Sequence, residues 1–135
     1  MLIHCCWEER PGKHTAAFDP DPANDPFSGM KKYVVSNTLK SANEWRDSFI
    51  IKGNVTDEIR KIKSQTGKNI IMDGSSVLVH TLIENELVDE YALHVYPIVL
   101  GIGKRLFPDG KHFILNLIES SPLPTGVVYQ RYQSV

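Results

Sequence analysis

Gly74, Ser75 and Ser76 are the residues of this chain whose types and spacing best suit ligand chemistry. They follow the apolar run Asn69–Met72 and precede a helix-like pattern. Glycine lets backbone N–H groups approach a ligand closely, and a helix that begins at Ser75 or Ser76 offers unpaired N–H groups and a positive dipole end. This turn could therefore hold a phosphate or pyrophosphate. The alternative is a structural turn in which the glycine permits the bend and a serine caps the helix.

A second polar segment, formed by Ser36, Asn37 and Thr38, follows the strand-like run Lys32–Val35. In open α/β sheets, ligands bind at the carboxyl ends of strands. Two hydroxyls and an amide at such an end could hold the ribose or the 2′-phosphate of a dinucleotide. The alternative is a polar turn with Asn37 in a left-handed conformation. This segment is informative mainly in combination with the Gly74 turn, because the two strand ends, at Ser36 and Gly74, would flank one groove.

The elements that must position these residues alternate between strands and helices. One helix is expected to be capped by Thr56 and to end at Gly67, and a second follows Gly74 with an apolar face of Leu78, Val79, Leu82 and Ile83. Strands are expected over residues 32–35, 48–52, 69–72, 90–99, 112–118 and 127–132. This order predicts an α/β fold with a mixed, mostly parallel sheet, flanking helices and a C-terminal antiparallel hairpin.

Length and composition restrict the class of protein. The 135 residues fit a single domain over 1–135. Residues 1–30, which are rich in proline, read as an irregular arm in which Leu2–Trp7 form a short strand or a helix end. A net charge of −1 argues against nucleic-acid binding, and no apolar run reaches the about 18 residues of a membrane span. The only cysteines, Cys5 and Cys6, are adjacent, which excludes a disulfide framework and fits a cytoplasmic protein.

The other polar and aromatic side chains give no catalytic cluster. The histidines lack the spacing of metal ligands, so we predict no metal site, and no catalytic residue can be named. His80 and His94 are expected to be packed or surface residues, Lys104, Arg105 and Asp109 an ion-paired surface loop, and Trp7 and Trp45 core or interface residues.

Several motifs together resemble the dihydrofolate reductase-like superfamily, in the branch of the riboflavin-biosynthesis reductase domain. The resemblance covers about residues 26–132. The motifs are Lys32-Tyr33-Val34-Val35-Ser36-Asn37-Thr38-Leu39, Asp73-Gly74-Ser75-Ser76, Leu82-Ile83, Leu87-Val88-Asp89-Glu90, Pro97-Ile98-Val99-Leu100-Gly101 and Gly103-Lys104-Arg105-Leu106-Phe107.

This resemblance implies an NADPH-dependent reductase that acts on a pteridine or a ribosylaminopyrimidine-type heterocycle, as a homodimer. It places Gly74, Ser75 and Ser76 against the cofactor pyrophosphate. It places Ser36, Asn37 and Thr38 near the adenosine ribose and its 2′-phosphate. The chain departs from the family pattern at two of these positions, because many relatives carry a basic residue where Asn37 stands and a glycine where Ser76 stands.

The resemblance also implies that the family's N-terminal segment is missing. That segment carries a Ser-x-Asp-Gly strand, a helix, and a strand leading to a Gly-Arg-x-Thr turn, and it includes the central strand of the sheet. We expect residues 1–30, a second chain or a longer gene product to fill the gap. Two alternatives to the reductase follow: a truncated, non-catalytic module for nucleotide binding or oligomerisation, and a phosphosugar binder that uses only the Gly74 turn.

Overall fold

The computed structural model describes residues 2–5, 27, 29–42, 47–72 and 74–135. The predictions for Cys6, Trp7, Trp45 and most of the 1–30 arm lie outside the described residues. The chain divides into two compact units, Met1–Leu78 and Val79–Val135, which are described in turn. No helix in the described part has the length and apolarity needed to cross a membrane.

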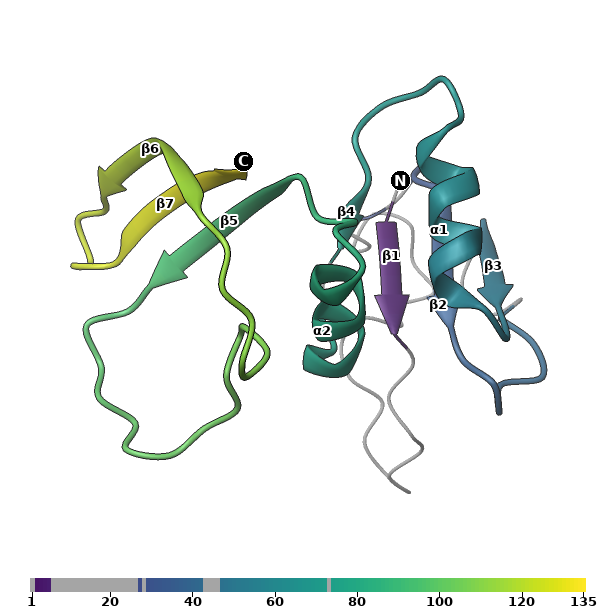
Figure 1. Ribbon diagram of the computed structural model, residues 1–135, viewed down its shortest axis with the longest axis horizontal. Helices are drawn as coiled ribbons and strands as arrows, with labels where there is room; N and C mark the ends of the chain where they lie inside the picture. Colours follow the sequence, from purple (N-terminus) through teal and green to yellow (C-terminus); the bar gives the residue numbers. More distant parts are fainter. Residues whose placement is uncertain (1, 6–26, 28, 43–46, 73) are drawn as a thin grey trace. The chain divides into compact units, whose positions relative to one another are not determined.

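The first unit contains a four-stranded parallel sheet in the order β3-β2-β1-β4 (Figure 1). Residues from the arm form the strand between β2 and β4, so residues 1–30 supply one strand inside this sheet. This is the first of the three ways in which the sheet was expected to be filled. The strands are β1 Leu2–Cys5, β2 Lys32–Val35, β3 Ser48–Ile51 and β4 Ile71–Met72.

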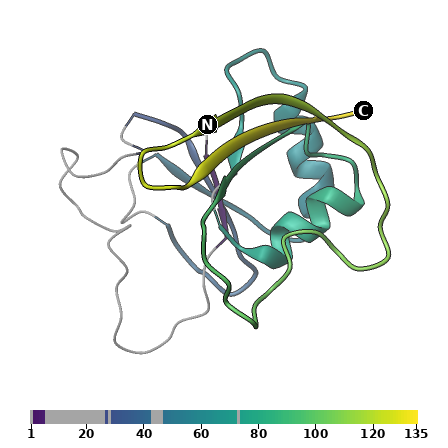
Figure 2. The same cartoon turned by 90° about the vertical axis from the view of Figure 1, so that its left-hand side faces the viewer.

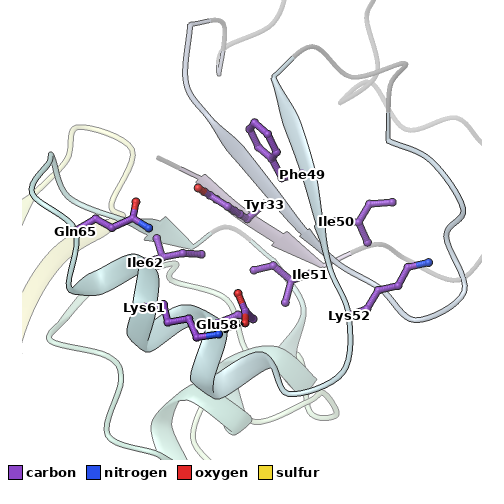
Figure 3. A pocket seen from close by; sticks show the side chains of 9 residues that line it. All are labelled: Tyr33, Phe49, Ile50, Ile51, Lys52, Glu58, Lys61, Ile62 and Gln65. Carbon is purple, nitrogen blue, oxygen red and sulfur yellow. Dashed lines mark hydrogen bonds and ion pairs between the residues drawn. The ribbon is translucent and has the colours of Figure 1, made fainter.

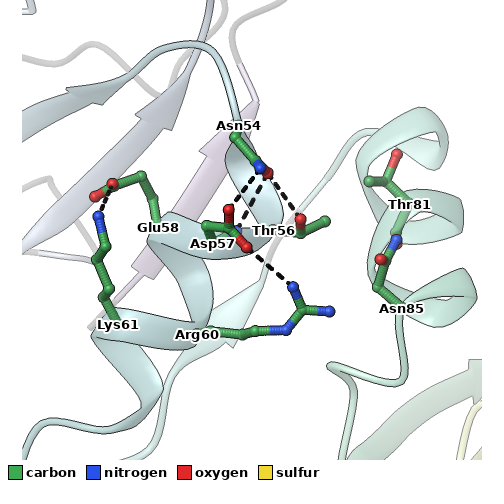
Figure 4. Close-up of polar contacts among 8 residues, drawn as sticks. All are labelled: Asn54, Thr56, Asp57, Glu58, Arg60, Lys61, Thr81 and Asn85. Carbon is green, nitrogen blue, oxygen red and sulfur yellow. Dashed lines mark hydrogen bonds and ion pairs between the residues drawn. The ribbon is translucent and has the colours of Figure 1, made fainter.

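Helix α1, Val55–Lys63, follows β3 and is capped by Asn54 rather than by Thr56, which corrects the prediction. The Asn54 Oδ1 atom accepts hydrogen bonds from the backbone N–H of Asp57, at 3.3 Å, and from the Thr56 hydroxyl, at 2.8 Å (Figure 4). The cap therefore lies two residues before Thr56, and the helix begins two residues earlier than predicted, at Val55. It also ends earlier than Gly67, at the cap residue Ser64.

The two faces of the parallel sheet carry different apolar groups. Side chains alternate along a strand, and the register pairs Tyr33 with Phe49 and Val35 with Ile51 on one face. Helix α1 contributes the buried Ile59 and Ile62. The core of the opposite face consists of the buried Val34 and Ala42, packed against Phe27, Leu39 and Ile50.

The second unit contains a three-stranded antiparallel sheet in the order β5-β7-β6. The predicted C-terminal hairpin is present in the yellow-green to yellow segment of Figure 2. However, β5 was expected to join the parallel sheet and instead pairs antiparallel with β7. The parallel strands and the antiparallel strands of this α/β fold thus form two separate sheets. The strands are β5 Glu90–Val95, β6 Leu115–Pro122 and β7 Val128–Ser134.

Helix α2, Ser76–Glu84, leads into the second unit and anchors the long β5–β6 connection. Its apolar face is close to the prediction, with Leu78, Leu82 and Ile83 buried and Val79 partly buried. The His80 ring Nε2 lies 3.0 Å from the carbonyl oxygen of Arg105. The Lys111 Nζ donates to the last carbonyl of the helix, that of Glu84, at 3.4 Å. Residues 96–114 are therefore attached to α2 at two points.

Three aromatic rings fix the same connection to β5. Tyr91 is 8% exposed, and its ring centroid lies 5.5 Å from that of Phe107 and 6.3 Å from that of Phe113. Phe107 and Phe113 meet edge to face at 5.4 Å. Such pairs add to the free energy of area burial, so this cluster forms the core of the second unit near β5.

We expect the free energy of unfolding to fall above about pH 10 because of Tyr91. Burial raises the pKa of Tyr91 above its ordinary value of 10.0, against a smaller lowering by the hydrogen bond with Ser134. A raised pKa in the folded state means that stability is fully present below the ordinary pKa and is lost as pH rises through the folded one. Urea unfolding between about pH 9 and about pH 11 measures this loss.

The matched variants for this experiment are Tyr91→Phe and Tyr96→Phe. Tyr91→Phe should flatten this part of the pH dependence, because the titrating hydroxyl is gone. Tyr96→Phe alters a side chain that is 61% exposed and should leave the wild-type slope in place. An unchanged slope in Tyr91→Phe would show that another group causes the alkaline loss.

Candidate cofactor-binding site

Both predicted ligand-binding segments belong to the first unit and lie at the carboxyl edge of its parallel sheet. The Ser36–Thr38 segment follows β2, and Gly74 lies between β4 and α2. Only β1 separates β2 from β4 in the sheet. Two interstrand spacings of about 4.8 Å put these strand ends about 10 Å apart, a span that a dinucleotide can bridge. The expected juxtaposition of two strand ends is therefore present in the topology.

Hydrogen bonds fold the Ser36 segment into a turn with two hydroxyls close together. The Ser36 backbone N–H donates to the carbonyl of Ile51 at 3.1 Å, which extends the β2–β3 ladder by one residue. The Ser36 Oγ accepts from the backbone N–H of Leu39 at 3.1 Å and lies 3.4 Å from the Thr38 Oγ1. Each hydroxyl has one proton, and one of the two donates to the other, so the proton of the second hydroxyl can be donated to an anion.

Asn37 ties this turn to the residues that follow β3. Its Oδ1 accepts a hydrogen bond from the backbone N–H of Gly53 at 3.2 Å. Asn37 does not occur among the residues with positive φ, so the left-handed alternative for it is wrong. The side chain is exposed, and its amide N–H₂ group is a hydrogen-bond donor that the bond to Gly53 does not use.

The Gly74 turn has two consecutive residues with positive φ. Gly74 has a φ of 93° and Ser75 a φ of 56°. The Ser75 Oγ accepts from the backbone N–H of Leu78 at 3.3 Å, so Ser75, and not Ser76, caps α2. Ser76 is the first helical residue, and a backbone N–H at that position has no partner within the helix. An exposed glycine before an open helix end fits a pyrophosphate in geometry and in charge.

The other charged residues and histidines considered in the sequence analysis have contacts outside these two turns. Arg105 and Asp109 form the predicted ion pair in an exposed loop. His80 contacts a backbone carbonyl, and the exposed His94 lies 5.2 Å from the ring of Tyr129 across the β5–β7 pair. Among the described residues, no group of three or more histidine, cysteine, aspartate or glutamate side chains could hold a metal ion.

A pocket of about 390 Å³ lies between α1 and strands β2 and β3 (Figure 3). Tyr33 and Phe49 form one wall, with ring centroids 5.7 Å apart. Glu58 accepts a hydrogen bond from Lys61 at 2.6 Å, which raises the pKa of Lys61 above its ordinary value. Neither predicted segment lines this pocket. Its lining residues are Tyr33, Phe49, Ile50, Ile51, Lys52, Glu58, Lys61, Ile62 and Gln65.

Lys52 is an exposed cation at this sheet edge that the sequence analysis does not single out. It follows β3 directly and precedes Gly53, whose N–H is bound by Asn37. The predicted strands could have drawn attention to Lys52. If β2 and β3 are parallel neighbours, their ends, at Ser36 and Lys52, lie at the same edge of the sheet.

Comparison with known proteins identifies the family and the fold of this chain. The family model described as the RibD C-terminal domain matches residues 9–129, which is most of the chain. This chain belongs to the RibD C-terminal domain family. The expected resemblance to riboflavin-biosynthesis reductase domains is confirmed, and so is the mixed α/β fold of dihydrofolate reductase type.

Two curated relatives of this RibD C-terminal domain come from Bacillus subtilis strain 168, and both are uncharacterized. YyaP is 36% identical over 114 residues, which cover 82% of this chain and 60% of YyaP. YwjB is 30% identical over 82 residues, which cover 61% of this chain and 47% of YwjB. The chain therefore spans about half to three fifths of the length of these relatives.

Solved structures support the same fold. A protein of Shewanella sp. PV-4 assigned to riboflavin biosynthesis has a TM-score of 0.72 at 19% identity, covering 99% of this chain and 73% of its own. RibD of Acinetobacter baumannii has a TM-score of 0.60 at 12% identity, covering 99% and 46%. A pyrimidine reductase-like protein of Corynebacterium diphtheriae has a TM-score of 0.59 at 17% identity, covering 87% and 54%. At these identities the likeness concerns the fold alone.

Proposed function

We propose that this RibD C-terminal domain binds NADPH at the carboxyl edge of its parallel sheet and acts as a reductase of a pteridine or ribosylaminopyrimidine-type heterocycle. The observation that carries the proposal is the placement of two phosphate-compatible turns at one sheet edge with a single strand between them. Family membership supports a reductase-like role.

The residues present fit the two anionic groups of this cofactor, the pyrophosphate and the 2′-phosphate. Gly74, Ser75 and Ser76 would hold the pyrophosphate, because they combine close backbone approach with an open helix N-terminus. Ser36, Asn37 and Thr38 would hold the adenosine ribose and its 2′-phosphate through two hydroxyls and an amide. The bound cofactor supplies a hydride, and the protein positions it. No residue is assigned as a proton donor.

We further propose a homodimer in the cytoplasm. Six large apolar side chains of the segment that ends β5 and begins the connection are at least half exposed, and such a patch is typical of a protein interface. They are Val95 (50%), Tyr96 (61%), Ile98 (65%), Val99 (97%), Leu100 (78%) and Ile102 (90%).

A second candidate function, a non-catalytic nucleotide-binding or oligomerisation module, is favoured by one observation. The chain spans only 60% and 47% of the two curated relatives, so groups outside these shared residues could be required for turnover. Such a module would bind NADPH and leave it unoxidised in the presence of pterins and ribosylaminopyrimidines. A reductase would consume it.

The first test is a binding titration. We expect NADPH, added up to about 1 mM, to change the tryptophan fluorescence and to raise the melting temperature of the protein. Ribose 5-phosphate serves as the control ligand, because a phosphosugar binder would respond to it as strongly as to NADPH. A flat titration together with an unshifted melting temperature would rule out the cofactor site.

A further inference from the structure

We propose that Lys52 is the cation that selects a cofactor carrying a 2′-phosphate. This inference rests on the cofactor site proposed above and assigns its specificity. The turn of Ser36, Asn37 and Thr38 has hydrogen-bond donors and no positive charge. A phosphate monoester carries about −1.5 to −2 charges at pH 7, and proteins bind it through charge-assisted hydrogen bonds. A positive side chain must therefore come from a neighbouring segment.

The β2–β3 ladder places Lys52 beside this turn. The parallel register pairs Val34 with Ile50 and Val35 with Ile51. The ladder then continues past both strands, through the 3.1 Å bond from the Ser36 N–H to the Ile51 carbonyl and the 3.2 Å bond from the Gly53 N–H to the Asn37 Oδ1. Lys52 lies between these two bonds, about one interstrand spacing of 4.8 Å from the Ser36 backbone.

The alternation of side chains puts Lys52 on the same sheet face as Ser36. Figure 3 shows Ile50 and Lys52 pointing to one side of β3 and Ile51 pointing to the other, toward α1. Ile50 is paired with Val34, and Ser36 shares the face of Val34 because it lies two residues further along the strand direction. The ammonium group and the Ser36 hydroxyl can therefore converge on one phosphate.

Lys52 is also available for a ligand. Its side chain is exposed, and the ion pairs recorded among the described residues use Arg60, Lys61, Arg105 and Arg131 instead. Lys61 lines the same pocket and is held by Glu58. Lys40, two residues beyond Thr38, is exposed as well, and it lies outside the β2–β3 ladder that fixes Lys52.

The test compares two ligands that differ only in the 2′-phosphate: adenosine 2′,5′-bisphosphate and adenosine 5′-monophosphate. Their dissociation constants are measured by calorimetry for the wild type, Lys52→Gln, Lys40→Gln and Lys68→Gln. Lys68 is an exposed lysine of the α1–β4 connection, at the other edge of the sheet, and serves as the matched control.

We expect Lys52→Gln to weaken the bisphosphate about tenfold and to leave the monophosphate unchanged, because only the 2′-phosphate contact is lost. Lys52→Arg should keep the preference, and Lys68→Gln should have no effect. The melting temperature of the free Lys52→Gln protein should equal that of the wild type, since Lys52 holds no other side chain in place.

Three results would overturn this assignment. Lys52→Gln could bind both ligands as the wild type does, it could lose affinity for both equally, or Lys40→Gln could be the variant that loses the bisphosphate selectively. Failure of the proposed function gives a different outcome, because a wild-type protein without the cofactor site would bind neither adenosine ligand nor NADPH.

Discussion

Replacing Gly74 with valine is expected to abolish NADPH binding, with a loss of affinity of more than about 100-fold. Gly74 has a φ of 93° and is followed by Ser75 with a φ of 56°. A branched side chain at Gly74 would occupy the space through which the pyrophosphate reaches the backbone, and it would oppose the positive φ that aims the turn. Both effects act on the same contact, so little affinity should remain.

The same substitution should also destabilise the fold, by about 1–3 kcal/mol, because a β-branched residue at positive φ is strained. The fold should stay recognisable, since the turn is exposed and no core side chain is altered. Circular dichroism and urea unfolding measure this part. Binding is measured by fluorescence titration at a temperature where the variant is folded.

Gly110→Val is the matched control for strain. Gly110 has a φ of 75°, with nothing within 4 Å of the position that a Cβ would take, and it lies in the connection between β5 and β6. This variant should lose a comparable amount of stability and keep its affinity for NADPH. If Gly74→Val bound NADPH as tightly as Gly110→Val does, the Gly74 turn would be structural only.

The bounds of β2 and a serine cap for α2, which depend on residues close together in the sequence, could be predicted from the sequence. The run Lys32–Val35 contains one aromatic and two β-branched residues, and it forms β2 with the predicted bounds. The acids Asp57 and Glu58 occupy the first turn of α1 as expected, where the helix dipole favours them. The sequence predicts that Ser75 or Ser76 caps α2. In the structure Ser75 is the cap, because its Oγ accepts a hydrogen bond from the Leu78 N–H.

Features that depend on distant pairing could not be predicted in the same way. The β5 run has one buried residue, Tyr91, and this pattern does not identify the strand that pairs with it. Its pairing with β7, from Glu90 with Gln133 to Val95 with Val128, depends on residues about 40 positions away. Lys52 was missed for the same reason, because its significance comes from the register between β2 and β3 and not from any local motif.

Leu82→Ala is expected to lower the free energy of unfolding by about 2–4 kcal/mol. The Leu82 side chain is 4% exposed and lies between the buried Leu78 and Ile83 on one helix face. Truncation removes buried methyl groups and leaves a cavity, and both effects lower the free energy of unfolding. Urea unfolding followed by circular dichroism measures the change as a lower midpoint with an unchanged m-value.

Val77→Ala provides the control within the same helix. The Val77 side chain is 72% exposed, so truncation removes little buried surface, and alanine has the higher helix propensity. Its free energy of unfolding should stay within about 0.5 kcal/mol of the wild type. A cost for Leu82→Ala as small as that for Val77→Ala would mean that this face of α2 is not part of the core. The attachment of the β5–β6 connection to α2 would then depend on the polar contacts of His80 and Lys111, beside the aromatic contacts that fix the connection to β5.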